Sequence, residues 1–165
     1  MISADLLLRI LLIGAGATLA MDLWAWLRRK AFGIPSLDYA LVGRWLGHMT
    51  RGRFHHASIV AASPVPAERA VGWIAHYAIG IAFAALPVAI AGTEWVGAPT
   101  LAPALVAGLV SVAAPFFVMQ PALGFGVAAS RTPQPRVARQ RSVVTHLVFG
   151  IGLYLAAFGL AMLDR

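Results

Sequence analysis

Four long apolar stretches constrain this chain more than any other feature of its sequence. They cover about residues 4–27, 70–91, 100–122 and 143–163, and each approaches the roughly 20 residues that a helix needs to cross a bilayer. Of the 165 residues, 60% are hydrophobic and only 12% are charged, whereas soluble domains carry roughly 25% charged residues. The pattern predicts an all-α integral membrane protein, a four-helix bundle that forms a single domain over residues 1–165.

The basic residues are divided unequally between the segments that join these stretches. Seven lie between the first and second stretches and four between the third and fourth, which leaves only Arg9 and Arg165 for the other side. Loops rich in Lys and Arg stay in the cytoplasm, so we expect both basic loops to be cytoplasmic and both termini to be periplasmic or extracellular. The net charge of +7 is therefore a topological signal, and no nucleic-acid partner is expected. The first stretch is too long for a cleaved signal peptide and is followed by the basic residues 28–30, so we expect it to remain as a helix.

The first basic segment contains an amphipathic pattern. Ser36 is a candidate N-cap, and apolar residues then recur with helical spacing, whereas Asp38, Arg44 and His48 fall largely on the opposite side. The apolar set is Leu37, Leu41, Val42, Trp45, Leu46 and Met49. The pattern predicts a helix over about residues 37–49 that lies in the cytoplasmic membrane interface.

Each predicted spanning helix carries one polar residue on the cytoplasmic side. Counted from the nearest loop arginines at 1.5 Å per residue, Asp22, His76 and His146 lie roughly 7–10 Å deep, and Gln120 lies near the same leaflet. Small residues occur one helical turn from these positions, and small residues mark closely packed faces of membrane helices. They are Thr18, Gly72, Gly80, Gly124, Ser142 and Gly150. We therefore expect all four polar side chains to face the interior of the bundle and to line one site.

Titratable groups at membrane depth are costly and commonly functional. A carboxylate beside an imidazole orients the ring and favours its protonated form, so Asp22 is expected to pair with His76 or His146. Purely structural readings stand beside this one: each histidine could bond across helices, Asp22 could pair with a loop arginine, and Gln120 could be a cross-helix bond rather than a ligand. The proline at 121 is expected to bend the third helix.

The function that this site predicts is binding or movement of a cation or proton. His76 and His146 are the candidate ligands if the site holds a metal ion or haem, and no cysteine is present to supply a thiolate. One alternative is a membrane-embedded enzyme or electron carrier that handles haem, a quinone or a lipid. The other is a structural or assembly subunit in which the polar groups only fix helix register. The sequence leaves open whether the protein is an enzyme.

A second cluster surrounds the stretch "RGRFHH". It consists of Arg51, Arg53, His55 and His56 around Phe54, with His48 upstream. Basic residues with an aromatic residue suit the anionic headgroups of a bilayer, and this is the first interpretation. The alternative is a point at which a cation or proton enters. Small-residue faces on the helices also allow a homo-oligomer without requiring one.

Several unusual segments occur in an order that resembles a known family. They include "GAGATLAMDLW", "FGIPSLDYALVGRWLGH", "RGRFHH", "GWIAHYAIGIAFA", "PTLAPALVAGLV", "APFFVMQPALGFGVAASRTP" and "THLVFGIGLYL". Together they resemble a bacterial family of small four-helix membrane proteins, domain of unknown function 2938, over nearly the whole chain. The resemblance implies a membrane fold in a bacterial inner membrane. It implies no activity, substrate or catalytic residue.

Overall fold

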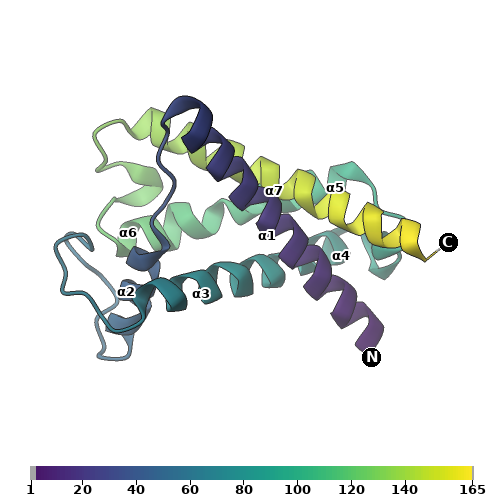
Figure 1. Cartoon of the computed structure of the whole chain (residues 1–165), viewed down its shortest axis with the longest axis horizontal. Helices are drawn as coiled ribbons and strands as arrows, with labels where there is room; N and C mark the ends of the chain where they lie inside the picture. Colours follow the sequence, from purple (N-terminus) through teal and green to yellow (C-terminus); the bar gives the residue numbers. More distant parts are fainter. Residues whose placement is uncertain (1–2, 165) are drawn as a thin grey trace. The chain divides into compact units, whose positions relative to one another are not determined.

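The computed structural model describes residues 3–164, and every regular element within that range is a helix (Figure 1). Four segments of these residues are long and apolar enough to cross a membrane. They are α1 (Ala4–Phe32), α3 (Glu68–Phe83) with α4 (Ala85–Ala91), the stretch from α5 (Leu101–Ser111) to α6 (Gln120–Ala122), and α7 (Pro135–Leu163). The all-α class and the four span-like helices predicted from the sequence are confirmed. Arg165, one of the two basic residues expected on the periplasmic side, lies outside the described residues.

Two of the long helices reach further than their apolar stretches. The Ser3 hydroxyl accepts the Leu6 N–H and begins α1, which continues through the basic residues to a left-handed Gly33 whose N–H bonds the carbonyls of Arg28 and Arg29. Helix α7 begins at Pro135, eight residues before its apolar part, because proline has the right φ for a first helical position and lacks only an N–H that would be unpaired there.

Two of the span-like segments are interrupted. The α-helix pauses at Ala84 between α3 and α4, three residues before the buried Pro87. The third segment contains η2 (Pro115–Met119), a π-helical turn in which the Gln120 N–H bonds the carbonyl of Pro115. The irregular turn therefore begins six residues before Pro121, the position at which the sequence predicts a bend, and Gln120 follows it directly.

The described residues form two compact units. Unit 1 contains residues 3–36, 77–111 and 144–164, and unit 2 contains residues 37–76 and 112–143. The core of unit 1 is built from α1, α5 and α7, and its buried side chains include Ile13, Ala17, Ala104, Phe149, Leu153 and Ala157. Glycines let these helices approach closely: a Cβ on Gly152 would lie 2.9 Å from the Ala17 Cα, and one on Gly108 would lie 2.8 Å from the Gly150 Cα. Small residues thus allow backbone contact, as they do in membrane helices.

Unit 2 is organised around α2 (Tyr39–Met49) and the first residues of α3. Asp38 caps α2 by accepting the Ala40 N–H at 3.0 Å, so the helix begins at Tyr39 and not after Ser36. Helix α2 crosses α3 at Gly43 and Gly72, where a Cβ on Gly43 would lie 2.8 Å from the Gly72 nitrogen. The two backbones are therefore in direct contact, and only glycine fits at the crossing.

The segment after α2 is attached to the turn that follows α6. The His56 N–H donates to the Ala122 carbonyl at 2.9 Å, and the Ile59 N–H donates to the Leu123 carbonyl at 3.1 Å. Residues 53–68 thereby pack against the side of α2 that the sequence pattern assigns as polar. His48, on that side, is only 6% exposed.

Candidate functional site

The four predicted site residues are divided between the two units. Asp22 and His146 belong to unit 1, whereas His76 and Gln120 belong to unit 2. Each of them has a hydrogen-bond partner within its own unit. A site shared by all four residues stays a prediction.

Asp22 is half-buried on α1 and accepts a hydrogen bond across helices. The donor is the hydroxyl of Tyr77 on α3, whose oxygen lies 3.0 Å from the Asp22 Oδ2. Helices α1 and α3 come close at this point because Gly80 of α3 has no side chain. Its backbone packs directly on the hydroxyl of Thr18, one turn from Asp22 on α1. The carboxylate is therefore held by a neutral donor from another span-like helix, and Tyr77 is a site residue that the sequence reasoning missed.

His146 of α7 contacts Ser111 at the end of α5. The Ser111 Oγ lies 2.7 Å from the His146 Nδ1 and donates its single proton to the Gly108 carbonyl, also at 2.7 Å. The imidazole must then donate its Nδ1–H to the hydroxyl, which leaves a lone pair on Nε2 in the neutral ring. Ser111 is 1% exposed, so this serine fixes the tautomer and orientation of His146 in the interior of unit 1.

His76 lies in an aromatic cluster of unit 2. Its Nε2 is 3.0 Å from the Tyr39 hydroxyl, and its ring stacks on that of Tyr39 with centroids 4.2 Å apart. The Trp73 ring makes an edge contact with the same imidazole, with ring centroids 5.8 Å apart. Tyr39 is the first residue of α2, so His76 connects the span-like α3 to the shorter helix.

Gln120 is buried beside α7 and only weakly bonded. Its Nε2 donates to the Ser142 Oγ at 3.5 Å, which is at the outer limit for such a bond. Gln120 is only 8% exposed, and its Oε1 is buried without a hydrogen-bond partner among the described residues. The amide can therefore accept a hydrogen bond that these residues do not supply.

The structure brings together two members of the accessory cluster and leaves the other three exposed. The His48 Nδ1 lies 2.7 Å from the His56 Nε2, and both rings are about 95% buried. Arg51, Arg53 and His55 are exposed. The adjacent histidines His55 and His56 thus have opposite environments, and the contact of interest joins residues eight positions apart.

The hydrogen bonds of this pair indicate which ring nitrogens carry a hydrogen when both rings are neutral. The His48 Nε2 is 3.1 Å from the Ser63 carbonyl, which can only accept, so a neutral His48 presents an Nδ1 lone pair to the N–H of His56. The His56 Nδ1 is then an acceptor, and it is buried without a partner among residues 3–164. Burial, together with the positive charge of Arg53, lowers the pKa of His56, which favours the neutral form of this ring.

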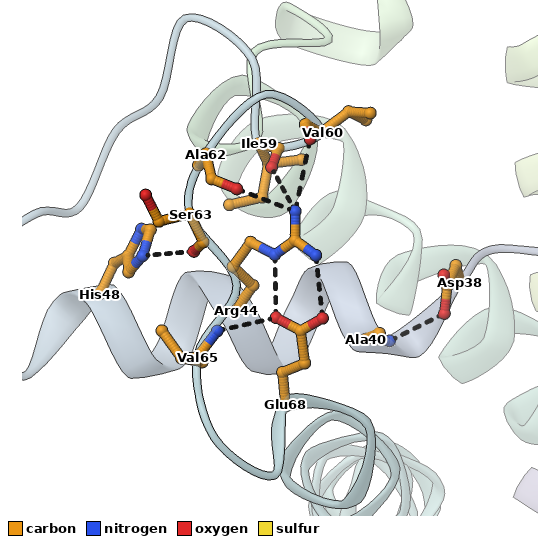
Figure 2. Close-up of polar contacts among 10 residues, drawn as sticks. All are labelled: Asp38, Ala40, Arg44, His48, Ile59, Val60, Ala62, Ser63, Val65 and Glu68. Carbon is orange, nitrogen blue, oxygen red and sulfur yellow. Dashed lines mark hydrogen bonds and ion pairs between the residues drawn. The ribbon is translucent and has the colours of Figure 1, made fainter.

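An ion pair next to these histidines attaches the loop to α2. Figure 2 shows Arg44 donating through Nε and Nη2 to both carboxylate oxygens of Glu68, each at 2.9 Å. Its Nη1 donates to the carbonyls of Ile59 and Ala62 at 3.2 and 3.0 Å, and the Glu68 carboxylate also accepts the Val65 N–H. The hydrogen bonds to Glu68 raise the pKa of the Arg44 guanidinium. Arg44 therefore connects α2, the loop and the start of α3, and its role is structural.

Among residues 3–164, no three or more His, Asp or Glu side chains are grouped so that they could hold a metal ion. The predicted metal ligands His76 and His146 belong to different units, so a metal or haem site formed by them stays a prediction. Within unit 2, the short hydrogen bond between His48 and His56 occupies one ring nitrogen of each histidine.

Comparison with known proteins identifies the family but not an activity. A model of the family described as Protein of unknown function (DUF2938) matches residues 11–160. The chain belongs to this family. No curated protein and no solved structure gives a significant match. The DUF2938 match includes residues from all four span-like helices, which confirms the resemblance seen in the sequence. A functional assignment must come from the side chains described above.

Proposed function

We propose that this DUF2938 protein spans the bacterial inner membrane and moves a proton or small cation through it, with Asp22 as the central group. The observation that carries the proposal is the Asp22 carboxylate on α1, held at 3.0 Å by the Tyr77 hydroxyl of α3. Both residues lie in helices that are long and apolar enough to cross a membrane. Ionisable residues in such helices are rare and mark ion pathways and proton relays.

A second polar contact in unit 1 supports the same function. The Ser111–His146 bond joins α5 to α7 and gives the imidazole a defined tautomer that can accept a proton on Nε2. Unit 1 therefore contains a carboxylate on α1, held from α3, and an oriented imidazole on α7, held from α5. Carboxylates and imidazoles are the groups from which membrane proton relays are built.

Proton flux into liposomes tests the proposal. The purified protein is reconstituted around a pH-sensitive dye, a potassium diffusion potential is imposed with valinomycin, and internal acidification is recorded. We expect Asp22→Asn to reduce the flux to that of protein-free liposomes, because it preserves the shape and an acceptor oxygen but removes the charge. Tyr77→Phe should reduce the flux partially. Tyr154→Phe is the matched control, since Tyr154 is another half-buried tyrosine of unit 1 whose ring packs near Phe158.

Each other outcome has a defined meaning. Wild-type flux of protons, sodium and potassium equal to that of protein-free liposomes would reject transport. Full activity of Asp22→Asn would show that the carboxylate charge has no role. An absorption band typical of haem in the purified protein would favour the electron-carrier alternative, in which His76 and His146 are the first ligands to test.

A further inference from the structure

The loop after α2 exposes an aromatic ring on a fixed backbone. The side chain of Phe54 is 54% exposed, yet its carbonyl accepts the Trp45 indole N–H at 2.8 Å. The neighbouring N–H groups of Arg53 and His56 donate to the carbonyls of His48 and Ala122. The exposure of Phe54 is therefore a property of the folded loop and not of a loose segment.

Inward-facing residues hold the loop on both sides of this ring. His56 is 5% exposed and bonded to His48, and Ile59 is fully buried against the turn after α6. Arg44 binds the carbonyls of Ile59 and Ala62 (Figure 2). These contacts order the loop so that Phe54 faces outward.

The charge around Phe54 is of one sign. Arg51, Arg53 and His55 are exposed beside it, and residues 50–67 contain no Asp or Glu. A single exposed aromatic residue needs no explanation by itself. An ordered aromatic ring that follows two arginines has the composition of a segment that enters the headgroup region of an anionic bilayer.

The position of the loop in the chain favours a bilayer over a protein as the partner. It leads directly into α3, whose first residue is Glu68 and which is long and apolar enough, together with α4, to cross a membrane. A basic segment that borders such a helix lies within reach of lipid headgroups. Guanidinium groups bind phosphate oxygens with two parallel hydrogen bonds.

We infer that residues 51–55 form a lipid anchor in which Phe54 inserts between headgroups and Arg51 and Arg53 bind the phosphates of anionic lipids. The anchor does not depend on proton transport, so either proposal can fail without the other. Each arginine near an anionic membrane surface strengthens binding to that surface by about fivefold, so the two together strengthen it on the order of 25-fold.

The absence of cysteine from the chain allows a single-site test. Phe54→Cys is labelled with a nitroxide, which is apolar and similar in size to the phenyl ring, and the protein is placed in nanodiscs of phosphatidylcholine alone or with one-third phosphatidylglycerol. Collision with oxygen, which partitions into lipid, and with a water-soluble nickel chelate is measured by electron paramagnetic resonance. We expect the label to favour oxygen in the discs that contain phosphatidylglycerol and nickel in the neutral discs.

Two controls identify the cause. Adding Arg51→Gln and Arg53→Gln to the labelled protein should abolish the dependence on phosphatidylglycerol. A label on Glu94→Cys, an exposed site in η1 (Thr93–Val96) with no nearby Lys or Arg in the sequence, should show no such dependence.

Three results would overturn the anchor. They are a label that favours nickel in both kinds of disc, one that favours oxygen equally in both, and one that is protected from both reagents. The first result would place the loop in water, the second would remove the role of lipid charge, and the third would indicate a protein partner or a second copy of the chain.

Discussion

Replacing Gly43 with alanine should force α2 away from the start of α3. A Cβ at this position would lie 2.7 Å from the Glu68 carbonyl carbon and 2.8 Å from the Gly72 nitrogen, with the Glu68 carbonyl oxygen closer still. All three are backbone atoms, so no side-chain rotation can relieve the overlap. An ordinary contact begins near 3.4 Å, and the helices must therefore separate by at least about 0.7 Å.

Such a shift affects more than the two glycines. The bonds from Arg44 to Glu68, at 2.9 Å, and the contact of Tyr39 with His76, at 3.0 Å, span the same crossing. Lengthened by 0.7 Å, they would pass the limit at which a hydrogen bond exists. Overpacking costs about 1–3 kcal/mol, and each lost hydrogen bond adds about 1 kcal/mol. With three such hydrogen bonds, we expect Gly43→Ala to lower the free energy of unfolding by about 4–6 kcal/mol.

The assay is denaturant unfolding in detergent micelles, followed by tryptophan fluorescence. Gly47→Ala, one turn later on α2, is the matched control, because its Cβ would meet the side chain of Val65 at 2.7 Å, which can move aside. It should cost about 1 kcal/mol or less. Gly159→Ala on α7 meets no atom within 4 Å and should be neutral or stabilising by up to about 1 kcal/mol. If Gly43→Ala is no more destabilising than Gly47→Ala, the close crossing of α2 and α3 is wrong.

Three further predictions concern the loops. Arg44→Met should destabilise the protein by about 2–4 kcal/mol because it leaves the partly buried Glu68 carboxylate unpaired, and adding Glu68→Leu should restore part of that loss in a double-mutant cycle; simple additivity would contradict this. Because the pKa of His56 is lowered in the folded protein, the folded chain binds fewer protons than the unfolded chain, so the free energy of unfolding should fall as the pH drops below about 6.5. His56→Gln should flatten this pH dependence and His55→Gln should not; an unchanged slope in the first variant would assign the effect elsewhere. A reporter inserted near Arg136 should be cytoplasmic and one fused to the C-terminus periplasmic, whereas a cytoplasmic C-terminus would show that one of the four spans is wrong.

The sequence was sufficient to predict the four long helices because apolar length is a strong local signal. It placed their ends less well. Residues 28–32 and 135–142 are polar enough to be excluded by hydropathy, yet they are compatible with a helix and continue α1 and α7. Hydropathy reports where a lipid-compatible surface ends, whereas the helix ends at its cap, such as the left-handed Gly33.

The candidate site was predicted only as a set of unusual residues. Asp22 and His146 are conspicuous because their neighbours in the sequence are apolar, but Tyr77 and Ser111 are common residues in such helices and carried no signal. Their contacts depend on helix rotation and on glycine-mediated approach between residues that are 55 and 35 positions apart. The His48–His56 pair was missed for a related reason, since the turn at Gly52, with φ of 75°, returns the chain to α2.

The π-helical turn at Pro115–Met119 makes the direction of the Gln120 side chain depend on chain length. A π turn holds one more residue than the α-helical turn that it replaces, and each residue of an α-helix advances the azimuth by about 100°. Every side chain after Met119 is therefore rotated by about that angle relative to an uninterrupted α-helix. Removing one residue from this turn would leave the composition and hydropathy of the segment nearly unchanged, yet it would turn Gln120 away from Ser142 and displace the carbonyls of Ala122 and Leu123 that hold the loop. The position of the buried amide is thus encoded by a count of residues, which no substitution at Gln120 itself would reveal.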